Sequence, residues 1–275
     1  MSPVQGMVKY FTAVSNRDIV ALMECFASNA VVLTGTITLT TKSDIESYYQ
    51  NGTLSSSNPY FFPIPHYLFV SNSTIAVEIE LHLNPTHTRL VGDWFTFDSA
   101  GKIRRLTIYD GPHWYPLADS AKPLVLSEIE NTLVHDTCLE LRQQSPMALI
   151  SHRTLQRYVS ALQTRNLEQL MLIFDLNAQI ITSTNVYTTQ DEIKQFYVNG
   201  ILHISNTHFS LRLSELFIYD DQIAVEIRFK IFPTQKKYVA DFFTFNRDGY
   251  IIRLNEYDGQ TVDSTQSFTT QKEHS

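Results

Sequence analysis

Cysteine and positive charge are both scarce in this sequence, and each shortage excludes a class of protein. Only Cys25 and Cys138 occur among 275 residues, which argues against a disulfide framework and favours a cytoplasmic location. The formal net charge is −7 at pH 7, so no electrostatic footprint for nucleic acid or an anionic membrane is expected. No apolar run approaches the roughly 20 residues of a membrane span. The N-terminal residues also lack the basic and apolar regions of a signal peptide.

An internal repeat dominates what is present. When the chain is shifted by 148 residues, residues 10–111 align without a gap on residues 158–259, and 41 of the 102 aligned positions are identical. Chance identity for such a composition is roughly one in seventeen. The identical segments include Ile75–Ile79 with Ile223–Ile227, and Tyr109–Gly111 with Tyr257–Gly259. A repeat of this length is a whole domain, so the sequence predicts two tandem copies of one domain.

The repeat sets the expected domain boundaries. Residues 1–112 form the first domain (the first half below) and residues 146–260 form the second (the second half). Residues 113–145 are expected to form a helical connector, because apolar residues recur there at helical spacing. Residues 261–275 are polar and are expected to be a disordered tail.

Each half begins with helical patterns and then changes to a period of two. In the first half helices are expected over residues 4–14, 19–26 and 42–51, with Asp18 as an N-cap and Gly52 as the residue that ends the third helix. Four strands follow at about 60–70, 74–84, 88–97 and 102–110, and Gly101 and Gly249 are expected to take positive φ in hairpin loops. Helices followed by an antiparallel meander predict an α+β fold with helices on one face of a curved sheet.

The strand alternation distinguishes two faces of each sheet. Val91, Asp93, Phe95 and Phe97 alternate on one face, and the second half repeats all four as Val239, Asp241, Phe243 and Phe245. We expect this matching face to be the interior. The opposite face carries Trp94 and Phe242, which predicts that it is covered too, with the two sheets paired as an intramolecular pseudo-dimer in a chain that could be monomeric.

Two pairs of polar residues lie within these apolar patterns. Asp93 and Asp241 are carboxylates on an interior strand face, where a charge must be paired, hydrogen-bonded or neutralised by a raised pKa. Tyr10 and Tyr158 lie on the apolar stripe of the first helix of each half. The simpler explanations are an aspartate that bonds nearby backbone or an arginine, and a tyrosine that only fills the core.

The segment from Tyr10 to Ala30 resembles the opening of ketosteroid isomerases, with a helical Tyr, a short Asp-Ile helix and Phe-Ala-x-x-Ala. The segment from Asp93 to Ile103 resembles a strand pair of the same family, which shares its cystatin-like α+β cone with SnoaL-like polyketide cyclases and nuclear transport factor 2. The resemblance implies that Tyr10 with Asp93, and Tyr158 with Asp241, form oxyanion holes in which the Asp is protonated, as is established for ketosteroid isomerase. Phe95 and Phe243 would line the same pockets.

The sequence departs from the isomerase pattern at the general base. Thr34 and Thr182 stand where that family has an Asp, and a threonine hydroxyl is no proton shuttle near pH 7. The cyclases take their acid/base from the last strand, where Glu256 matches their position and Ile108 is its counterpart in the first half. A solvated charge at the end of a strand is the alternative for Glu256. Asp110 and Asp258 either line the cone mouth or end the strand through turn hydrogen bonds.

These observations predict an enzyme without a cofactor. Tyr158, Asp241 and Glu256 are the expected catalytic residues, and Tyr10, Asp93, Asp110, Asp258, Phe95 and Phe243 are expected to bind a small apolar ligand. The expected reaction is isomerisation, cyclisation or dehydration of a polyketide-like or steroid-like carbonyl compound. The alternative is a module of the same fold that binds a small ligand or a protein without catalysis. The nine histidines show no spacing typical of a metal site.

Overall fold

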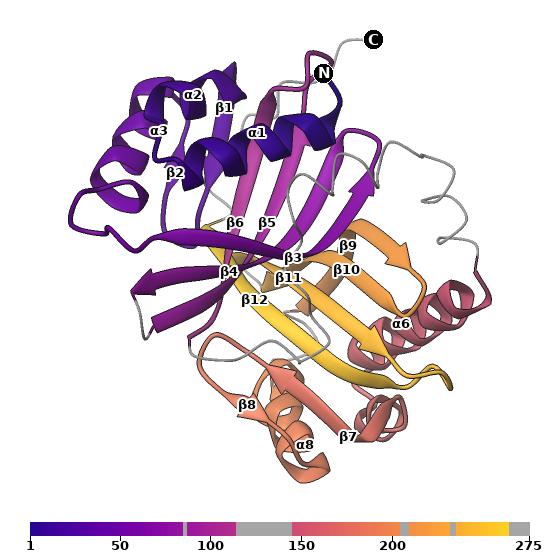
Figure 1. Ribbon diagram of the computed structural model, residues 1–275. Coiled ribbons are helices and arrows are strands. Elements are labelled where there is room, and N and C mark those ends of the chain that lie inside the picture. The colour runs from indigo at the N-terminus through magenta and orange to yellow at the C-terminus, as the bar shows by residue number, and fades with distance from the viewer. Residues whose placement is uncertain (85–86, 114–144, 204–208, 232–234, 264–275) are drawn as a thin grey trace.

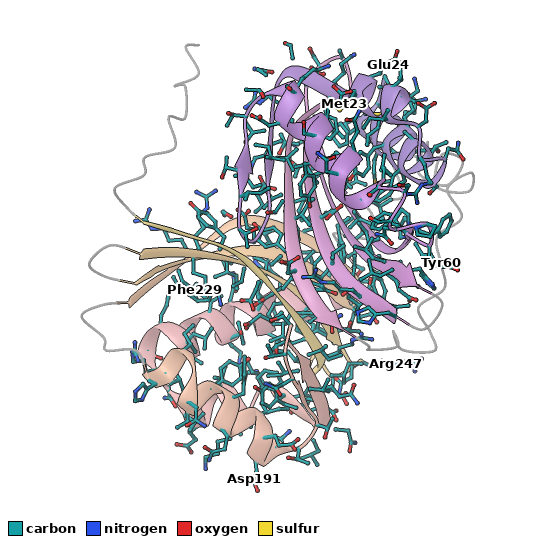
Figure 2. The ribbon with its side chains drawn as sticks, turned by 90° about the vertical axis from the view of Figure 1, so that its left-hand side faces the viewer. Met23, Glu24, Tyr60, Asp191, Phe229 and Arg247 are labelled. Carbon is teal, nitrogen blue, oxygen red and sulfur yellow. The ribbon has the colours of Figure 1, made fainter. Side chains whose placement is uncertain are left out.

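The two halves fold alike, each with its helices on one face of a curved antiparallel sheet. The computed structural model describes residues 1–84, 87–113, 145–203, 209–231 and 235–263. The helices of the two halves lie at opposite ends of the molecule, and the strands lie between them (Figures 1 and 2). The protein is therefore α+β, as the sequence predicts. The predicted connector lies mainly outside the described residues, as does most of the predicted tail, although the last strand extends to Asp263.

The element bounds show the repeat directly. The first half contains, in order, α1 (Pro3–Ser15), α2 (Ile19–Cys25), β1 (Phe26–Leu33), β2 (Thr38–Leu39), α3 (Lys42–Tyr48), a π-helical turn (Tyr49–Thr53), β3 (Phe62–Ser71), β4 (Thr74–Asn84), β5 (His87–Phe97) and β6 (Ile103–His113). The second half contains α6 (Pro146–Thr164), α7 (Leu167–Met171), β7 (Phe174–Ile181), β8 (Val186–Tyr187), α8 (Gln190–Asn199), a 3₁₀ turn (Ile201–His203), β9 (Phe209–Tyr219), β10 (Gln222–Ile231), β11 (Gln235–Phe245) and β12 (Ile251–Asp263).

Local sequence signals account for most element ends. Asp18 accepts a hydrogen bond from the Ala21 amide, which confirms the predicted N-cap of α2. Gly101 and Gly249 have φ of 74° and 82°, as predicted for the hairpin loops. The prediction that Gly52 ends the third helix is wrong. There α3 continues into the π-helical turn that contains Gly52, so the chain bends without a positive φ.

All the described strands belong to one twelve-stranded sheet that folds back on itself. Its main path is β3-β4-β5-β6-β12-β11-β10-β9, so the halves join where β6 meets β12. That joint is a single antiparallel pair, Asp110 opposite Asp258. Each half also adds a short parallel contact, β1 on β6 and β7 on β12. One backbone pair cannot fix the arrangement of two sheets, so side-chain packing must do so.

An aromatic layer packs the outer faces of the two sheets against each other. Trp94 and Phe242 are 3% and 5% exposed, and their ring centroids lie 5.4 Å apart in an edge-to-face arrangement. The buried core of this layer consists of Phe69, Ala76, Leu90, Trp94 and Tyr109 from the first half with Phe217, Tyr219, Ala224, Ala240, Phe242 and Tyr257 from the second. The covered outer face predicted from Trp94 and Phe242 is therefore observed within one chain.

Each half contributes one buried glutamate that accepts a hydrogen bond from a tyrosine of the other half. The Tyr257 hydroxyl donates to Glu78, and the Tyr109 hydroxyl donates to Glu226, so each half supplies one tyrosine and one glutamate. Asn255 also donates to Glu78 at 2.5 Å. Glu78 and Glu226 are 0% and 2% exposed, so the hydrogen bonds replace part of the water that each carboxylate loses. Within the described residues Glu78 Oε2 has no hydrogen-bond partner. The two contacts are related by the repeat, so the interface is pseudo-symmetric. They form only when the two sheets pack in one particular alignment.

Candidate functional site

The inner face of each sheet carries the predicted site residues in equivalent places. On β11 and β12 Asp241 lies directly opposite Glu256, and on β5 and β6 Asp93 lies directly opposite Ile108. Residues directly opposite in an antiparallel pair share a face with their Cβ atoms about 5 Å apart. The second half therefore places two carboxyl groups side by side under its helices, whereas the first half has one carboxyl group beside an isoleucine.

Burial controls the protonation of these carboxyl groups. It raises the pKa of Asp93 from 3.8 to about 8, with a smaller contribution from the negative charge of Asp110. Burial also raises the pKa of Asp241 well above its ordinary value, and the neighbouring Glu256 adds to the rise. The pKa of Glu256 is raised to about 7, mainly by burial, while Lys237 acts in the opposite direction. Glu256 keeps part of its surface in solvent, which moderates this shift.

One carboxyl oxygen of each interior aspartate lacks a hydrogen-bond partner in the described part of the chain. Asp93 and Asp241 are 4% and 1% exposed, and within the described residues the Oδ1 atom of each has no hydrogen-bond partner. The predicted alternative of an aspartate paired with a buried arginine is not what the described part of the chain shows. A buried carboxyl group is less costly to leave in this state when it is protonated. Each can then donate a hydrogen bond to a carbonyl or enolate oxygen.

A second tyrosine accompanies each predicted one. The hydroxyls of Tyr10 and Tyr49 are 2.8 Å apart, and the Tyr197 hydroxyl donates to Tyr158 at 3.3 Å. Burial raises the pKa of Tyr10 well above 10, with further contributions from Tyr49 and Asp93. Burial does the same for the pKa of Tyr158, helped by Tyr197 and Asp241. These phenols remain neutral donors, and each pair lies near its interior aspartate without a direct bond to it among the bonds described.

The two phenylalanines predicted to line the pockets pack on those tyrosines. Tyr10 contacts Phe95 edge to face with ring centroids 5.2 Å apart, and Tyr158 contacts Phe243 in the same way at 5.1 Å. Phe95 and Phe243 are 0% and 1% exposed. They hold the tyrosine rings in orientation and keep the surroundings of each aspartate apolar.

Each half has an ion pair on its inner face, two residues along the last strand from Glu256 or Ile108. Arg89 Nη2 lies 2.6 Å from Asp110 Oδ1, and Lys237 Nζ lies 2.6 Å from Asp258 Oδ1. Ser183 Oγ also donates to Asp258 Oδ2 at 2.8 Å. Asp110 and Asp258 are 39% and 40% exposed at their side chains, so they lie nearer solvent than Asp93 and Asp241. Asp110 and Asp258 also face each other where β6 meets β12, so both lie within strands at the joint of the two halves.

Thr34 and Thr182 each form hydrogen bonds within the loop that follows β1 or β7. Thr34 Oγ1 accepts from the Ile37 amide at 3.1 Å, and Thr182 Oγ1 accepts from the Asn185 amide at 3.1 Å. In each case the backbone amide of the threonine also bonds the carbonyl three residues on, at 2.9 Å. The hydroxyls at the isomerase base position therefore close the loop after β1 or β7.

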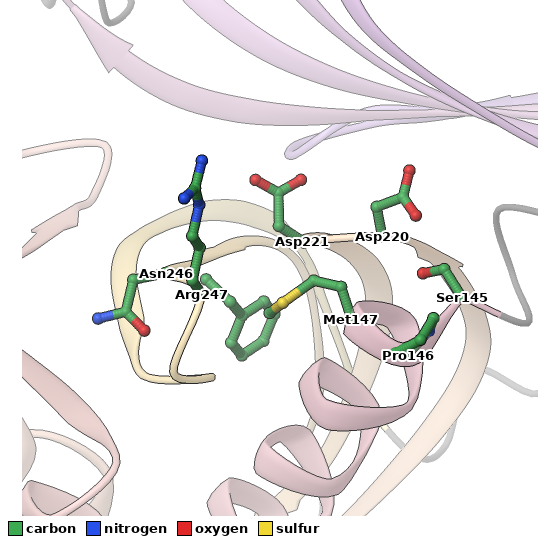
Figure 3. Close-up of a pocket in the computed structure, with 8 residues that line it drawn as sticks. Ser145, Pro146, Met147, Asp220, Asp221, Asn246 and Arg247 are labelled. Atoms are coloured by element: carbon green, nitrogen blue, oxygen red, sulfur yellow. The ribbon is translucent and has the colours of Figure 1, made fainter.

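One pocket among the described residues lies away from these groups. It has a volume of about 600 Å³ and is lined by Ser145, Pro146, Met147, Asp220, Asp221, Phe245, Asn246 and Arg247, so it lies beside the first turn of α6 (Figure 3). In the repeat alignment α6 begins five residues before α1, because Pro3 aligns with Ser151. This extra turn of α6 forms one wall of the pocket, which contains no predicted site residue.

Metal-ligating side chains are dispersed over the described residues, where no group of three or more His, Cys, Asp or Glu side chains is placed to hold a metal ion. None of the helices in the described part of the chain is long and apolar enough to cross a membrane.

Comparison with known proteins gives likenesses to single halves of the chain. The chain matches no protein family model and no curated protein sequence. It is similar to the structure of a candidate polyketide cyclase from Sinorhizobium meliloti, with 26% identity over 36% of this chain and 89% of that one and a TM-score of 0.33. It is also similar to RV0760c from Mycobacterium tuberculosis in complex with estradiol-17beta-hemisuccinate, with 15% identity over 42% and 95% of the two chains and a TM-score of 0.36.

A third likeness is to a SnoaL-like protein of unknown function from Burkholderia thailandensis. The identity is 13% over 39% of this chain and 93% of that one, with a TM-score of 0.35. Each of these structures spans about the share of the chain that one repeat occupies. At these TM-scores the likeness says nothing about what this protein does.

The structure adds residues that the sequence pattern does not single out. Tyr49 and Tyr197 are identical in the two halves and lie on the buried side of the third helix, which was the available signal. Lys237 and Ser183 differ from their counterparts Arg89 and Gly35, so identity between the halves could not have found them. Their role depends on contacts with Asp258, which lies 75 residues from Ser183 in the chain.

Proposed function

We propose that the second half is an acid–base enzyme domain that needs no cofactor. It would act on a small apolar carbonyl compound, polyketide-like or steroid-like, through an enolate-like intermediate. The observation that carries the proposal is the direct pairing of Asp241 with Glu256, with both pKa values raised. Adjacent carboxyl groups with different environments are suited to different protonation states, and hence to different roles.

The roles follow from burial. Asp241 is the more deeply buried, so it is the protonated donor that holds the carbonyl oxygen of the substrate. Glu256 has a pKa of about 7 and part of its surface in solvent, which suits a base that takes a proton from the carbon next to the carbonyl and returns it elsewhere. Tyr158 and Tyr197 are neutral donors beside Asp241. Isomerisation, cyclisation and dehydration all share the enolate step.

The first half supports the alternative function. It keeps Tyr10, Tyr49 and Asp93, but Ile108 faces Asp93 where the second half has Glu256. A cone with donors and no base can hold a carbonyl compound without converting it. We therefore propose that the first half binds a small apolar ligand and does not catalyse. No nucleic-acid or membrane partner is part of the proposal.

Hydrogen exchange into a ketone tests the catalytic proposal. The probe is 2-tetralone, an apolar ketone whose α-hydrogens are replaced by deuterium in D₂O each time an enolate forms. We expect the protein to accelerate exchange, measured by mass spectrometry, and Glu256→Gln to lower the rate roughly 10²–10⁴-fold. Glu24→Gln, an exposed glutamate at the far end of the first half (Figure 2), is the matched control. Exchange that is unaffected by Glu256→Gln would contradict the assignment of Glu256 as the base.

A further inference from the structure

Lys237 is a cation on the inner face of the second half, and neither the sequence pattern nor the proposed roles assign it a function. It lies on β11 beyond Val239, on the mouth side of Asp241. Its Nζ atom lies 2.6 Å from Asp258, and its positive charge also acts on Glu256 and Asp241. Lys237 is therefore the cation that faces the carboxyl pair among the described contacts.

A chain of three side chains fixes the position of Lys237. Ser183, just after β7, donates to one oxygen of Asp258, and the other oxygen of Asp258 forms an ion pair with Lys237. The lysine side chain is 35% exposed, so without these contacts it could turn into solvent. The ordered contacts hold the ammonium group over the inner face instead.

The first half lacks this arrangement. Arg89 pairs with Asp110 as Lys237 pairs with Asp258, but Gly35 stands where Ser183 does and Ile108 stands where Glu256 does. The charge of Asp110 reaches Asp93, whereas no effect of Arg89 on Asp93 is resolved. The lysine whose aspartate partner is held by a serine thus occurs in the half that has Glu256 as a second carboxyl group.

We propose that Lys237 is a positioning residue that keeps Glu256 available as a carboxylate. This rests on the proposed function in one respect, namely that Glu256 is the base. Burial and the negative charge of Asp258 oppose ionisation of Glu256, and the positive charge of Lys237 favours it. Glu256 and Asp258 lie on one face of β12, opposite Asp241 and Val239 of β11, so the ammonium group that pairs with Asp258 lies on the same face as Glu256. A nearby opposite charge favours the charged form of a carboxyl group. The other titratable groups that face the pair are the neutral phenols of Tyr158 and Tyr197.

Direct titration of Glu256 tests the proposal without any substrate. The side-chain carboxyl resonance is followed by ¹³C NMR against pH in the full-length protein, in Lys237→Met and in Lys237→Arg. We expect the Glu256 midpoint to rise by at least about one pH unit in Lys237→Met and to stay near the original value in Lys237→Arg. Lys237→Gln is the second neutral variant should the methionine variant not fold, and Arg89→Met is the matched control in the first half.

The outcomes separate this proposal from the proposed function. A Glu256 midpoint that Lys237→Met and Lys237→Gln leave unmoved overturns the role of Lys237, whatever the enzyme does. A midpoint near 4.5 in the unaltered protein, the ordinary value for Glu, removes the basis of both proposals. A raised midpoint that depends on Lys237, in a protein that exchanges no ketone hydrogens, supports the Lys237 proposal and contradicts the catalytic one. A merely structural ion pair would change stability and leave the midpoint in place.

Discussion

The two halves of this protein share a framework and differ at their centres. Strand order, hairpin loops, the interior aspartate, its paired tyrosines and the threonine that closes the loop after β1 or β7 are the same in both. Four of the differences between the halves lie at or beside that aspartate and its ion pair, namely Gly35 against Ser183, Tyr48 against Phe196, Arg89 against Lys237 and Ile108 against Glu256. The comparison teaches that the shared residues build and close the cone, while the differing ones decide what a bound molecule would meet.

The largest expected effect comes from exchanging the two centres. Glu256→Ile makes the second half like the first, and we expect ketone hydrogen exchange to fall roughly 10²–10⁴-fold because the base is lost. Adding Ile108→Glu places a carboxyl group opposite Asp93, and part of the rate is expected to return. Exchange rates of the single and double variants check this. A double variant no faster than Glu256→Ile would show that the halves differ by more than this position.

The aromatic layer should respond equally from either side. Trp94 and Phe242 are counterparts in the repeat and touch each other. Replacement of either by Ala is expected to lower the free energy of unfolding by about 3–5 kcal/mol, because it leaves a cavity between the sheets. Urea unfolding measures the cost. A large loss for one variant beside a negligible loss for the other would mean that the two halves do not share this interface on equal terms.

The pH dependence of stability should distinguish the halves. The pKa of Asp93 is raised from 3.8 to about 8, so between these values the folded protein holds a proton that the unfolded chain releases. The free energy of unfolding therefore falls as pH rises through this window, by about 1.4 kcal/mol for each pH unit, and levels off above it. Asp93→Asn removes this contribution and keeps a hydrogen-bond donor.

Asp241→Asn is the companion variant, and it leaves Glu256 to titrate. We expect Asp93→Asn to lose the contribution of the first half completely. Asp241→Asn should keep the Asp93 contribution and, from the second half, a smaller fall in stability up to about pH 7, where the raised pKa of Glu256 lies. Chemical unfolding at about pH 5 and about pH 9 measures both. A loss of about 3–5 kcal/mol in either variant at the lower pH would instead indicate a buried ion pair.

The smallest effect is expected at the threonines. Thr34→Val and Thr182→Val each remove a hydroxyl that accepts a backbone amide, and each should cost about 0.5–1.5 kcal/mol of stability. Neither should change ketone hydrogen exchange. A selective loss of exchange in Thr182→Val, with stability unchanged, would assign this hydroxyl to the chemistry after all.

The sequence was sufficient for the features that depend on local pattern. Alternation along the strands placed Asp93 and Asp241 on the inner face and Trp94 and Phe242 on the covered outer face, and the repeat set the register of both. Glu78 and Glu226 lie buried on that outer face. Their partners were not predictable, because Tyr257 and Tyr109 lie 179 and 117 residues away and belong to the other half.

The third helix shows the opposite case. Helical spacing through residue 51 predicted a regular end at Gly52, but the helix widens at Tyr49, and that residue turns its hydroxyl toward Tyr10. A periodic pattern cannot distinguish one extra residue per turn from a regular helix over so short a segment. The partner of Tyr10 was therefore missed. In the second half α8 is regular through Asn199, and Tyr197, the partner of Tyr158, was not singled out by the pattern either.

The exchange of tyrosine and glutamate between the halves has an evolutionary consequence. In a dimer of two identical chains, any mutation of the base position appears in both subunits at once, so activity and pairing are selected together. Here both copies lie in one gene, so a codon can change in one cone while its counterpart stays as it was. Selection on pairing acts on Glu78, Glu226, Tyr109 and Tyr257 jointly, and it does not couple position 108 to position 256.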